Sequence, residues 1–396
     1  MKLRDIYLIP LFWCLGISSL AYQALAVVRW SNGRKKYRFP PAAKWLFAYV
    51  IVYLVSLLAN FADADGQRWI SSLYNWTFWV MGLLLINYIF NLDHLDISAD
   101  LEKPARLMLL LMGTVALVTF FLQEAQSIPS ILGIAFDAQG FPPLIRDTLE
   151  LKIFASDWFD GHSSIRNSIF SPYSTATAAM GMLLLSLAII REKLVSWQFG
   201  LYFFLTLLVV LSTYSRLSVA CLFAFLILLA TIRLPFGLVL IGSVITAIAV
   251  GLMLSLFLEI WQDMNELRAG SSSVRFLMYE ETIKLAMREG PLWGVGVKSR
   301  DVFFIPLGSH STYLGVLLKT GMIGLFCMIM FQLSILQLYG RALTSKFSAG
   351  EPLIAMLTAM ILFLAFEDLD AAQPLCFLYF YVLAIYLRLA SRGQND

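Results

Sequence analysis

Charged residues are scarce in this chain. Asp, Glu, Lys and Arg make up only 14% of its 396 residues, whereas 59% of the residues are hydrophobic. A soluble domain of this length has no core large enough to bury that much apolar surface. The composition therefore excludes an ordinary soluble protein, and we expect a lipid bilayer to surround much of the chain.

Cysteine and excess charge are also lacking. The four cysteines all lie inside apolar stretches, where a thiol behaves as a small hydrophobic side chain, so we expect neither a disulfide nor a metal site from them. The formal net charge of +3 is too small, and the basic residues are too dispersed, to favour a nucleic acid as partner. We find no internal repeat, low-complexity tract or soluble segment, which indicates a single membrane domain over residues 1–396.

Apolar windows long enough to span a bilayer, about 20 residues each, recur along the chain. They predict an all-α polytopic membrane protein with about 11 transmembrane helices, or between about 10 and 12. The predicted spans are residues 6–28, 45–62, 69–90, 107–122, 173–190, 197–212, 217–232, 236–258, 312–337, 353–366 and 375–388. The first is longer than the apolar part of a secretory signal and leads into a basic segment rather than a cleavage site. We therefore expect it to remain as a span.

Basic residues set the predicted orientation. Six Lys or Arg residues lie between positions 29 and 44, and such a density beside a span marks the cytoplasmic side. Two connections, residues 123–172 and 259–311, are too long for simple turns and then fall on the outer, periplasmic side. We expect an irregular or partly re-entrant segment in the first, a helix over Ser273–Glu289 in the second, and the functional site beside them.

Three residues at apolar helix ends or in the outer loops are candidates for function. Arg216 lies where one predicted span ends and the next begins; the alternative is an arginine that extends to the membrane interface. Arg275 lies in the predicted outer helix, where a solvated surface residue is the alternative. His310, alone among three histidines, adjoins a span on the outer side. That position suits a base near neutral pH, although a lone histidine is more often structural.

Two further motifs lie near His310. The segment Pro291–Gly296 reads Pro-Leu-Trp-Gly-Val-Gly, and its Gly-x-Gly is by itself weak evidence for a phosphate cradle. The string His310-Ser-Thr-Tyr-Leu precedes a Gly-x-x-Gly that begins at Gly321. In this order, the motifs resemble the O-antigen ligase and polymerase superfamily, which includes capsule and exopolysaccharide polymerases.

The resemblance covers roughly residues 166–324. Its elements are Arg216 at a span boundary, Arg275 with Tyr279, Pro-Leu-x-Gly-x-Gly, His310-x-x-Tyr-Leu and Gly-x-x-Gly. Arg166, in Arg-Asn-Ser-Ile-Phe-Ser-Pro before a span, is a softer match. Two departures, Ser311 where ligases commonly have Asn and a short second outer loop, leave the acceptor open.

The resemblance implies a membrane glycosyltransferase that moves glycan from an undecaprenyl-diphosphate carrier to an acceptor hydroxyl. A diphosphate leaves readily, so the site needs cations rather than a general acid, and Arg216 and Arg275 would bind the diphosphate. His310 would take the proton of the acceptor. Further substrate contacts could come from Arg166, Tyr279, Tyr313 and Lys319. Lys319 could instead pair with an acidic group near Asp368.

The same resemblance implies partners and a location. The expected partners are the lipid-linked oligosaccharide, the lipid membrane and a glycan acceptor, and a chain-length regulator could act with them. We expect a multi-pass protein of the bacterial inner membrane whose site faces the periplasm, with inverting transfer and neither metal nor cofactor.

Other functions stay open at this point. The short outer loop favours a polymerase over a ligase that uses lipid A core. A flippase for the lipid-linked glycan would also need cations, but it predicts internal repeats that we do not find. A structural or regulatory membrane subunit is the third alternative.

Overall fold

The computed structural model describes residues 4–33, 38–62, 65–119, 121, 126–136, 148–155, 166–235, 269–298, 301–302, 305–344 and 350–392. The predicted span 236–258 lies outside these residues. Most of the remaining spans are helices: α3 (Pro41–Ala59), α4 (Gly66–Phe90), α5 (Lys103–Thr119), α8 (Ser174–Ala188), α9 (Trp197–Ser212), α10 (Arg216–Arg233), α14 (Thr312–Thr344), α15 (Glu351–Phe366) and α16 (Gln373–Arg392). Short helical turns lie at η1 (Asp5–Tyr7), η2 (Ile97–Glu102) and η4 (Leu369–Ala371).

Among the described helices, α3, α4, α10, α14 and α16 are long and apolar enough to cross a membrane. Helices α8, α9 and α15 are apolar but shorter. The prediction of an all-α membrane protein is confirmed as a class, while the number of spans stays a prediction.

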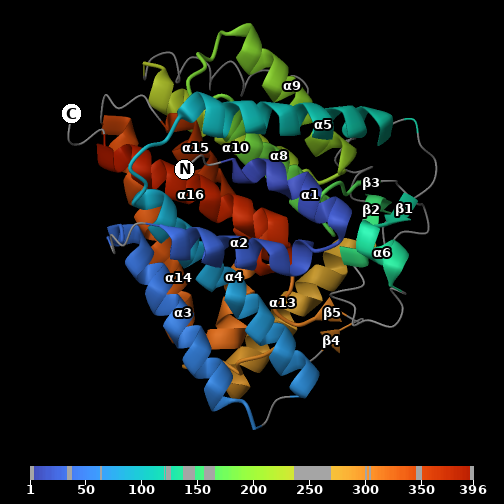
Figure 1. Ribbon diagram of the computed structural model, residues 1–396. Helices are drawn as coiled ribbons and strands as arrows, with labels where there is room; N and C mark the ends of the chain where they lie inside the picture. The colour runs from blue at the N-terminus through green and yellow to red at the C-terminus, as the bar shows by residue number, and fades with distance from the viewer. Residues whose placement is uncertain are drawn as a thin grey trace.

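The first predicted span is wrong, because residues 6–28 form a hairpin of two helices (Figure 1). Helix α1 (Leu8–Leu15) ends at Gly16, which adopts a left-handed conformation with φ of 79°, and α2 (Ser18–Asn32) runs back beside it. An ion pair between Asp5 and Arg29 closes the open end of the hairpin. Glycine tolerates this conformation at little cost, so one residue reverses an apolar stretch that has the length of a span.

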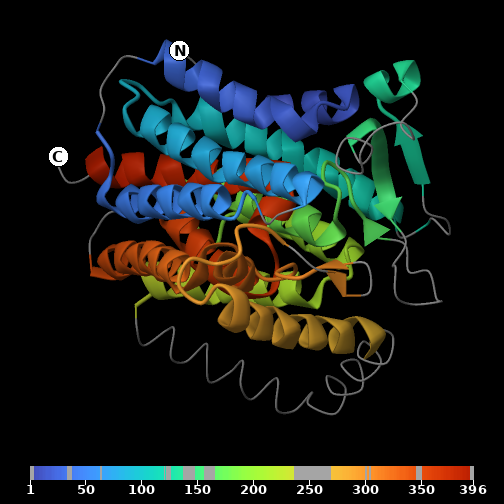
Figure 2. The ribbon, with the colours of Figure 1, turned by 90° about the horizontal axis from the view of Figure 1, so that it is seen from below.

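Two helices form the centre of the bundle. Side chains of α16 are buried on all sides from Leu375 to Leu387, and those of α8 are almost all buried as well. A helix that is apolar all round is buried either in protein or in lipid, and the burial of these two helices shows that their neighbours are protein. Helices α4, α15 and α2 pack on α16, and α5, α9 and α15 pack on α8, so these neighbours surround the centre (Figures 1 and 2). Helices α3 and α14 pack on each other outside it.

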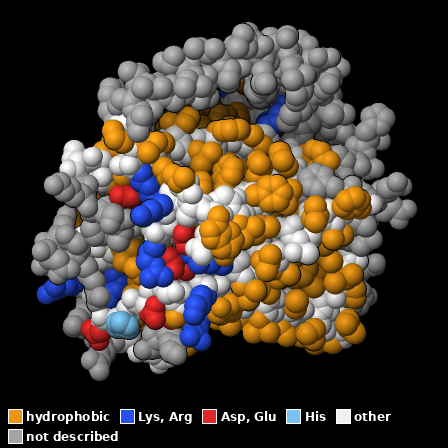
Figure 3. Space-filling model, turned by 90° about the horizontal axis from the view of Figure 1, so that it is seen from above, with side chains coloured by type: hydrophobic (Ala, Val, Ile, Leu, Met, Phe, Trp, Pro, Cys, Tyr) orange, Lys and Arg blue, Asp and Glu red, His pale blue; other side chains and the backbone are white. Residues whose placement is uncertain are grey.

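The flank of the bundle is apolar, as a lipid-facing surface should be. Large exposed side chains such as Phe47 on α3 and Phe223 on α10 point away from the core. Figure 3 shows such side chains over one flank, with charged side chains gathered toward one end.

That end, which we call the Arg29 end, holds several ion pairs among the residues that the structure describes. They join Asp5 with Arg29, Glu102 with Arg191, Arg106 with Glu192, and Arg233 with Glu351. Arg388 donates to the carbonyl oxygen of Phe90 at 2.9 Å and fixes the ends of α16 and α4 there. Several basic loop residues expected on one side of the membrane therefore lie at one end of the bundle. Which side of the membrane this end faces stays a prediction.

The opposite end, which we call the His310 end, holds the starts of α10, α14 and α16 and the described parts of both long connections. The first connection contains a small antiparallel sheet of β1 (Gln126–Pro129), β2 (Glu150–Ala155) and β3 (Arg166–Asn167), with the short helix α6 (Ile131–Ala135). The sequence did not predict this sheet. The second connection contains α13 (Ala269–Glu289), which confirms the predicted helix, and a two-stranded ribbon of β4 (Asp301–Val302) and β5 (Ile305–Pro306).

Candidate active site at the His310 end

Glu367, just after α15, joins two of the predicted site residues. Its Oε1 lies 3.2 Å from a guanidinium nitrogen of Arg275, and its Oε2 lies 3.9 Å from Nδ1 of His310. Arg216 lies close enough to Arg275 for the charge of Arg275 to act on it. The structure therefore brings Arg275 and His310 together at Glu367, with Arg216 near Arg275, although 94 residues of sequence separate Arg216 from His310.

Helix α13 is fixed against the start of α14 by two hydrogen bonds. The hydroxyl of Tyr279 donates to the carbonyl oxygen of His310 at 2.7 Å. The backbone N–H of Gly308 donates to the Thr282 hydroxyl at 2.9 Å. Tyr279, predicted as a substrate contact, thus holds the backbone of His310 in place. Since Arg275 lies one turn before Tyr279 on α13, this contact also positions the guanidinium group.

Backbone strain marks the same segments. Among the described residues other than glycine, only Phe170, Tyr214 and His310 have positive φ values, of 66°, 48° and 60°. Such conformations cost about 1 to 3 kcal/mol each and persist where the surrounding structure imposes them, often at functional sites. Each of the three lies within or beside a motif singled out in the sequence, and Tyr214 is two residues before Arg216.

The start of α14 is bound to the connection after α15. Ser311 caps α14, because its hydroxyl accepts from the N–H of Leu314 at 3.3 Å. The N–H and the hydroxyl of Thr312 both donate to the carbonyl oxygen of Glu367, at 3.1 and 2.8 Å. Asn caps helices as well as Ser does, so the departure at position 311 keeps a capping residue. Glu367 is held by its backbone as well as by its carboxylate.

Electrostatics keep Glu367 ionised. Burial alone would raise the pKa of its carboxyl, but the positive charge of Arg275 and the contact with the His310 side chain lower that pKa below the usual range. The carboxylate is therefore negative at neutral pH and balances part of the positive charge beside it. Among the described side chains of this group, Arg275 and His310 face Glu367, and Arg216 lies near Arg275.

A second charged cluster lies next to the first along the chain. Nζ of Lys298 is 2.5 Å from Asp368, and Nζ of Lys319 is 2.6 Å from Asp370, which also accepts from the indole of Trp79 at 3.0 Å. Burial, followed by the charge of Asp370, raises the pKa of Asp368 to about 6. Of the two alternatives for Lys319, the structure shows the pairing with an acidic group near Asp368. That acidic group is Asp370.

The Gly-x-Gly segment fills a break in α14. Gly321 leaves the helical conformation with φ of 64° and ψ of −162°, which frees backbone groups on both sides of it. The loop that precedes β4 binds them: the N–H groups of Val295 and Gly296 donate to carbonyls of α14 at 2.9 and 3.0 Å, and Met322 and Ile323 donate back to carbonyls of the loop. A Cβ on Gly294 or Gly321 would overlap the facing backbone. The glycines thus allow close backbone packing, and the observed partner is a helix break rather than a phosphate.

The remaining predicted residues lie at greater depth or to one side. The hydroxyl of Tyr313 donates to the carbonyl oxygen of Ile361 at 3.3 Å and so ties α14 to α15. Arg166 is 8% exposed on β3. Its neighbour Asn167 donates to the Ser212 hydroxyl at 3.3 Å, which places β3 beside the end of α9 that leads to Arg216.

Sequence reasoning did not assign a role to Glu367. The only available signal was its position in Glu367-Asp-Leu-Asp370, an acidic string between two apolar helices, where charges are costly. Its partners lie 92 and 57 residues earlier in the chain, so no local pattern connects them.

Comparison with known proteins bears on the same region. Residues 201–329 match the family model described as O-antigen ligase. The predicted resemblance to the O-antigen ligase and polymerase superfamily is confirmed. The match contains Arg216, Arg275, Tyr279, His310, Tyr313 and Lys319. A search of curated proteins gave no match. Over this segment the chain is thus similar to a family of membrane enzymes that act on polysaccharides.

Proposed function

We propose that the protein is a membrane glycosyltransferase that transfers glycan from an undecaprenyl-diphosphate carrier to an acceptor hydroxyl. The observation that carries the proposal is the meeting of Arg216, Arg275 and His310 at one end of the bundle, inside the segment that matches the O-antigen ligase family. We place this end at the periplasmic face of the bacterial inner membrane, because basic loops lie at the Arg29 end.

The two arginines serve the leaving group. When the bond between the anomeric carbon and the diphosphate oxygen breaks, its electron pair moves onto the diphosphate. Guanidinium groups bind such oxygens with paired hydrogen bonds and stabilise the charge that develops. The first turns of α10 and α14 begin beside Arg216 and His310, and the positive ends of these helices favour an anion at the same place.

His310 serves the acceptor. The acceptor oxygen forms the new bond to the anomeric carbon while its proton passes to the imidazole, which is general-base catalysis. Nδ1 of His310 faces Glu367, so Nε2 is the nitrogen left for the acceptor. The 3.9 Å separation from Glu367 is longer than a hydrogen bond. A closer approach in the substrate complex would let the carboxylate stabilise the imidazolium. Direct displacement of this kind inverts the anomeric centre, and no step requires a metal ion.

A polymerase and a ligase differ in their acceptor, which is a second lipid-linked repeat unit for a polymerase and lipid A core for a ligase. We favour a polymerase. Purified protein in nanodiscs is incubated with lipid-linked repeat units alone and, separately, with lipid A core added. Chains that lengthen without lipid A core support a polymerase. Transfer only when lipid A core is present supports a ligase.

A flippase is separated from both enzymes by bond formation. In proteoliposomes, movement of the lipid-linked glycan across the membrane without any new glycosidic bond, unchanged in a His310→Ala variant, would contradict the proposed enzyme. A chain-length regulator, if present, would change the product length without being required for the first transfer.

A further inference from the structure

The backbone of His310 is held in an uncommon conformation. Its φ of 60° lies in the left-handed region, which residues other than glycine rarely adopt, although histidine tolerates it better than most. The direction of the Cα–Cβ bond follows from the backbone conformation, so a relaxed backbone at this position would point the imidazole ring elsewhere. The contacts that impose the conformation therefore also determine where the proposed base lies.

A buried threonine fixes the backbone two residues before His310. The hydroxyl of Thr282 on α13 accepts from the N–H of Gly308 at 2.9 Å and donates to the carbonyl oxygen of Met278 at 2.6 Å. The proton of this hydroxyl is thus used within α13, and its lone pair binds the segment that leads to His310. Loss of the oxygen would leave a buried backbone N–H without this acceptor, which is costly.

A second buried threonine fixes the chain two residues after His310. The hydroxyl of Thr312, in the first turn of α14, donates to the carbonyl oxygen of Glu367 at 2.8 Å and accepts from the N–H of Leu369 at 3.0 Å. One side chain therefore binds the backbone on both sides of Asp368. It ties the start of α14 to the residue whose carboxylate lies beside His310.

Burial separates these threonines from the substrate. The side chain of His310 is 28% exposed and can meet an acceptor, whereas Thr282 and Thr312 are each 1% exposed. The hydroxyl of Tyr279 on α13 binds the carbonyl oxygen of His310 itself. Contacts from α13, α14 and the connection after α15 thus fix the segment around one exposed ring.

From these contacts we infer that Thr282 and Thr312 are positioning residues of the transfer reaction, whose hydroxyls hold His310 where its ring meets the acceptor oxygen. The inference rests on the proposed function, because it names residues that act through the proposed base. Loss of either hydroxyl should lower turnover, since a shift of a reacting group by about 1 Å can cost about 10²-fold in rate. Binding of the donor, which we assign to Arg216 and Arg275, should change little.

Valine and serine substitutions separate the hydroxyl from the shape of the side chain. Thr282→Val and Thr312→Val keep the shape and remove the hydroxyl, whereas Thr282→Ser and Thr312→Ser keep the hydroxyl. Release of undecaprenyl diphosphate from a lipid-linked donor gives kcat and KM in nanodiscs, at a temperature where each variant is folded. We expect kcat to fall about 10-fold to 10²-fold in the valine variants, with little change in KM for the donor. The serine variants should recover most of the rate.

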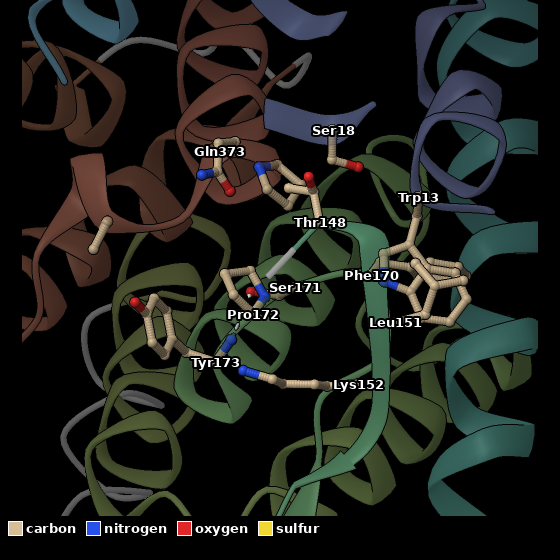
Figure 4. A pocket seen from close by; sticks show the side chains of 12 residues that line it. Trp13, Ser18, Thr148, Leu151, Lys152, Phe170, Ser171, Pro172, Tyr173 and Gln373 are labelled. Atoms are coloured by element: carbon tan, nitrogen blue, oxygen red, sulfur yellow. Dashed lines mark hydrogen bonds between the residues drawn. The ribbon is translucent and has the colours of Figure 1, made fainter. Parts of the chain in front are cut away.

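Thr177 on α8 provides the matched control. It is 0% exposed, and its hydroxyl donates to the carbonyl oxygen of Ile169 at 3.1 Å. That bond lies beside a pocket whose wall includes Trp13, Phe170 and Tyr173 (Figure 4), and the described residues that line this pocket lie outside α13 and α14. Thr177→Val removes a buried hydroxyl that does not hold His310, so it should keep the wild-type kcat.

A second series asks whether the two hydroxyls act through His310. His310→Ala removes the ring that they position, so adding Thr282→Val or Thr312→Val to it should cause no further loss of rate. NMR of labelled histidine follows the ring without any transfer reaction, because the chain has only three histidines and His310→Ala identifies the signal. We expect this signal to shift or broaden in both valine variants and to stay unchanged in Thr177→Val.

Four results would overturn the inference. The valine variants could keep the wild-type kcat, they could lose as much rate in the His310→Ala background as in the wild type, Thr177→Val could lose as much as they do, or the His310 signal could stay unchanged in them. A failure of the transferase proposal looks different. In that case no variant forms a glycosidic bond, while the His310 signal still responds to the two threonines.

Discussion

The two ends of the bundle use charge differently. At the Arg29 end, Arg29, Arg106, Arg191 and Arg233 each have a carboxylate partner, and Arg191 is 55% exposed. At the His310 end, Arg275 and His310 share Glu367, and Arg216 lies near Arg275. Pairs of opposite charge at a surface hold loops and require no ligand. Two arginines near each other can also bind an anionic ligand with paired hydrogen bonds, and we propose that this ligand is the diphosphate of the donor.

The largest expected difference between the ends concerns a buried ion pair. The side chains of Lys319 and Asp370 are 1% and 0% exposed, so Lys319→Ala leaves a buried carboxylate without its cation. We expect a loss of about 3 to 5 kcal/mol in the free energy of unfolding. Arg191→Ala at the Arg29 end should cost about 1 kcal/mol or less. Unfolding of both variants in detergent measures the difference, and similar losses would contradict the contrast.

Removal of a guanidinium group from the His310 end should act on catalysis. Arg275→Ala should lower the transfer rate by about 10² to 10³-fold, the usual effect of losing one group that stabilises developing charge. Arg106→Ala, which breaks a pair with Glu192 at the Arg29 end, should leave the rate unchanged. Both variants are compared at temperatures where each remains folded. A loss of rate as large in Arg106→Ala would show that the effect is structural.

The two glycines Gly321 and Gly340 of α14 should differ in how much stability the protein loses when each is replaced by alanine. Gly321→Ala places a side chain against the backbone of Leu292 at a φ that favours glycine, and we expect it to cost about 1 to 3 kcal/mol. Gly340→Ala, in the same helix with open space around it, should be neutral or slightly stabilising because alanine favours helix. Melting temperatures of the two variants test this pair. Equal tolerance would mean that the loop does not need the break.

The smallest expected effect is a dependence of stability on pH. Since the pKa of Glu367 is lowered in the folded protein, its contribution is present above the ordinary value of about 4.3 and is lost as the pH falls through the lowered pKa. Glu367→Gln removes this contribution of about 1 kcal/mol. Between neutral and acid pH, the wild type should therefore lose more stability than the variant. If the free energy of unfolding falls by the same amount with pH in the wild type and in Glu367→Gln, the lowered pKa of Glu367 contributes nothing to stability.

Much of the helical architecture was predictable, because bilayer-length apolar windows carry a strong signal. The predicted span over residues 6–28 was wrong, because Gly16 turns the chain within an apolar stretch. Hydropathy measures how apolar a stretch is and carries no information about a change of chain direction. The site was predictable in part. Arg216, Arg275 and His310 follow from their positions at helix ends and from the family resemblance, whereas Glu367 depends on contacts made only in three dimensions. The same holds for Gly294 and Gly321, whose function is to bring two backbones together.

The rate at which undecaprenyl diphosphate is released from a lipid-linked donor in the presence of acceptor tests most directly whether Arg216, Arg275 and His310 form one transfer site. His310→Ala should lower that rate by about 10² to 10⁴-fold while the protein still binds donor, and His94→Ala, outside the site, should not lower it. Release at the wild-type rate from the His310→Ala protein would contradict the account.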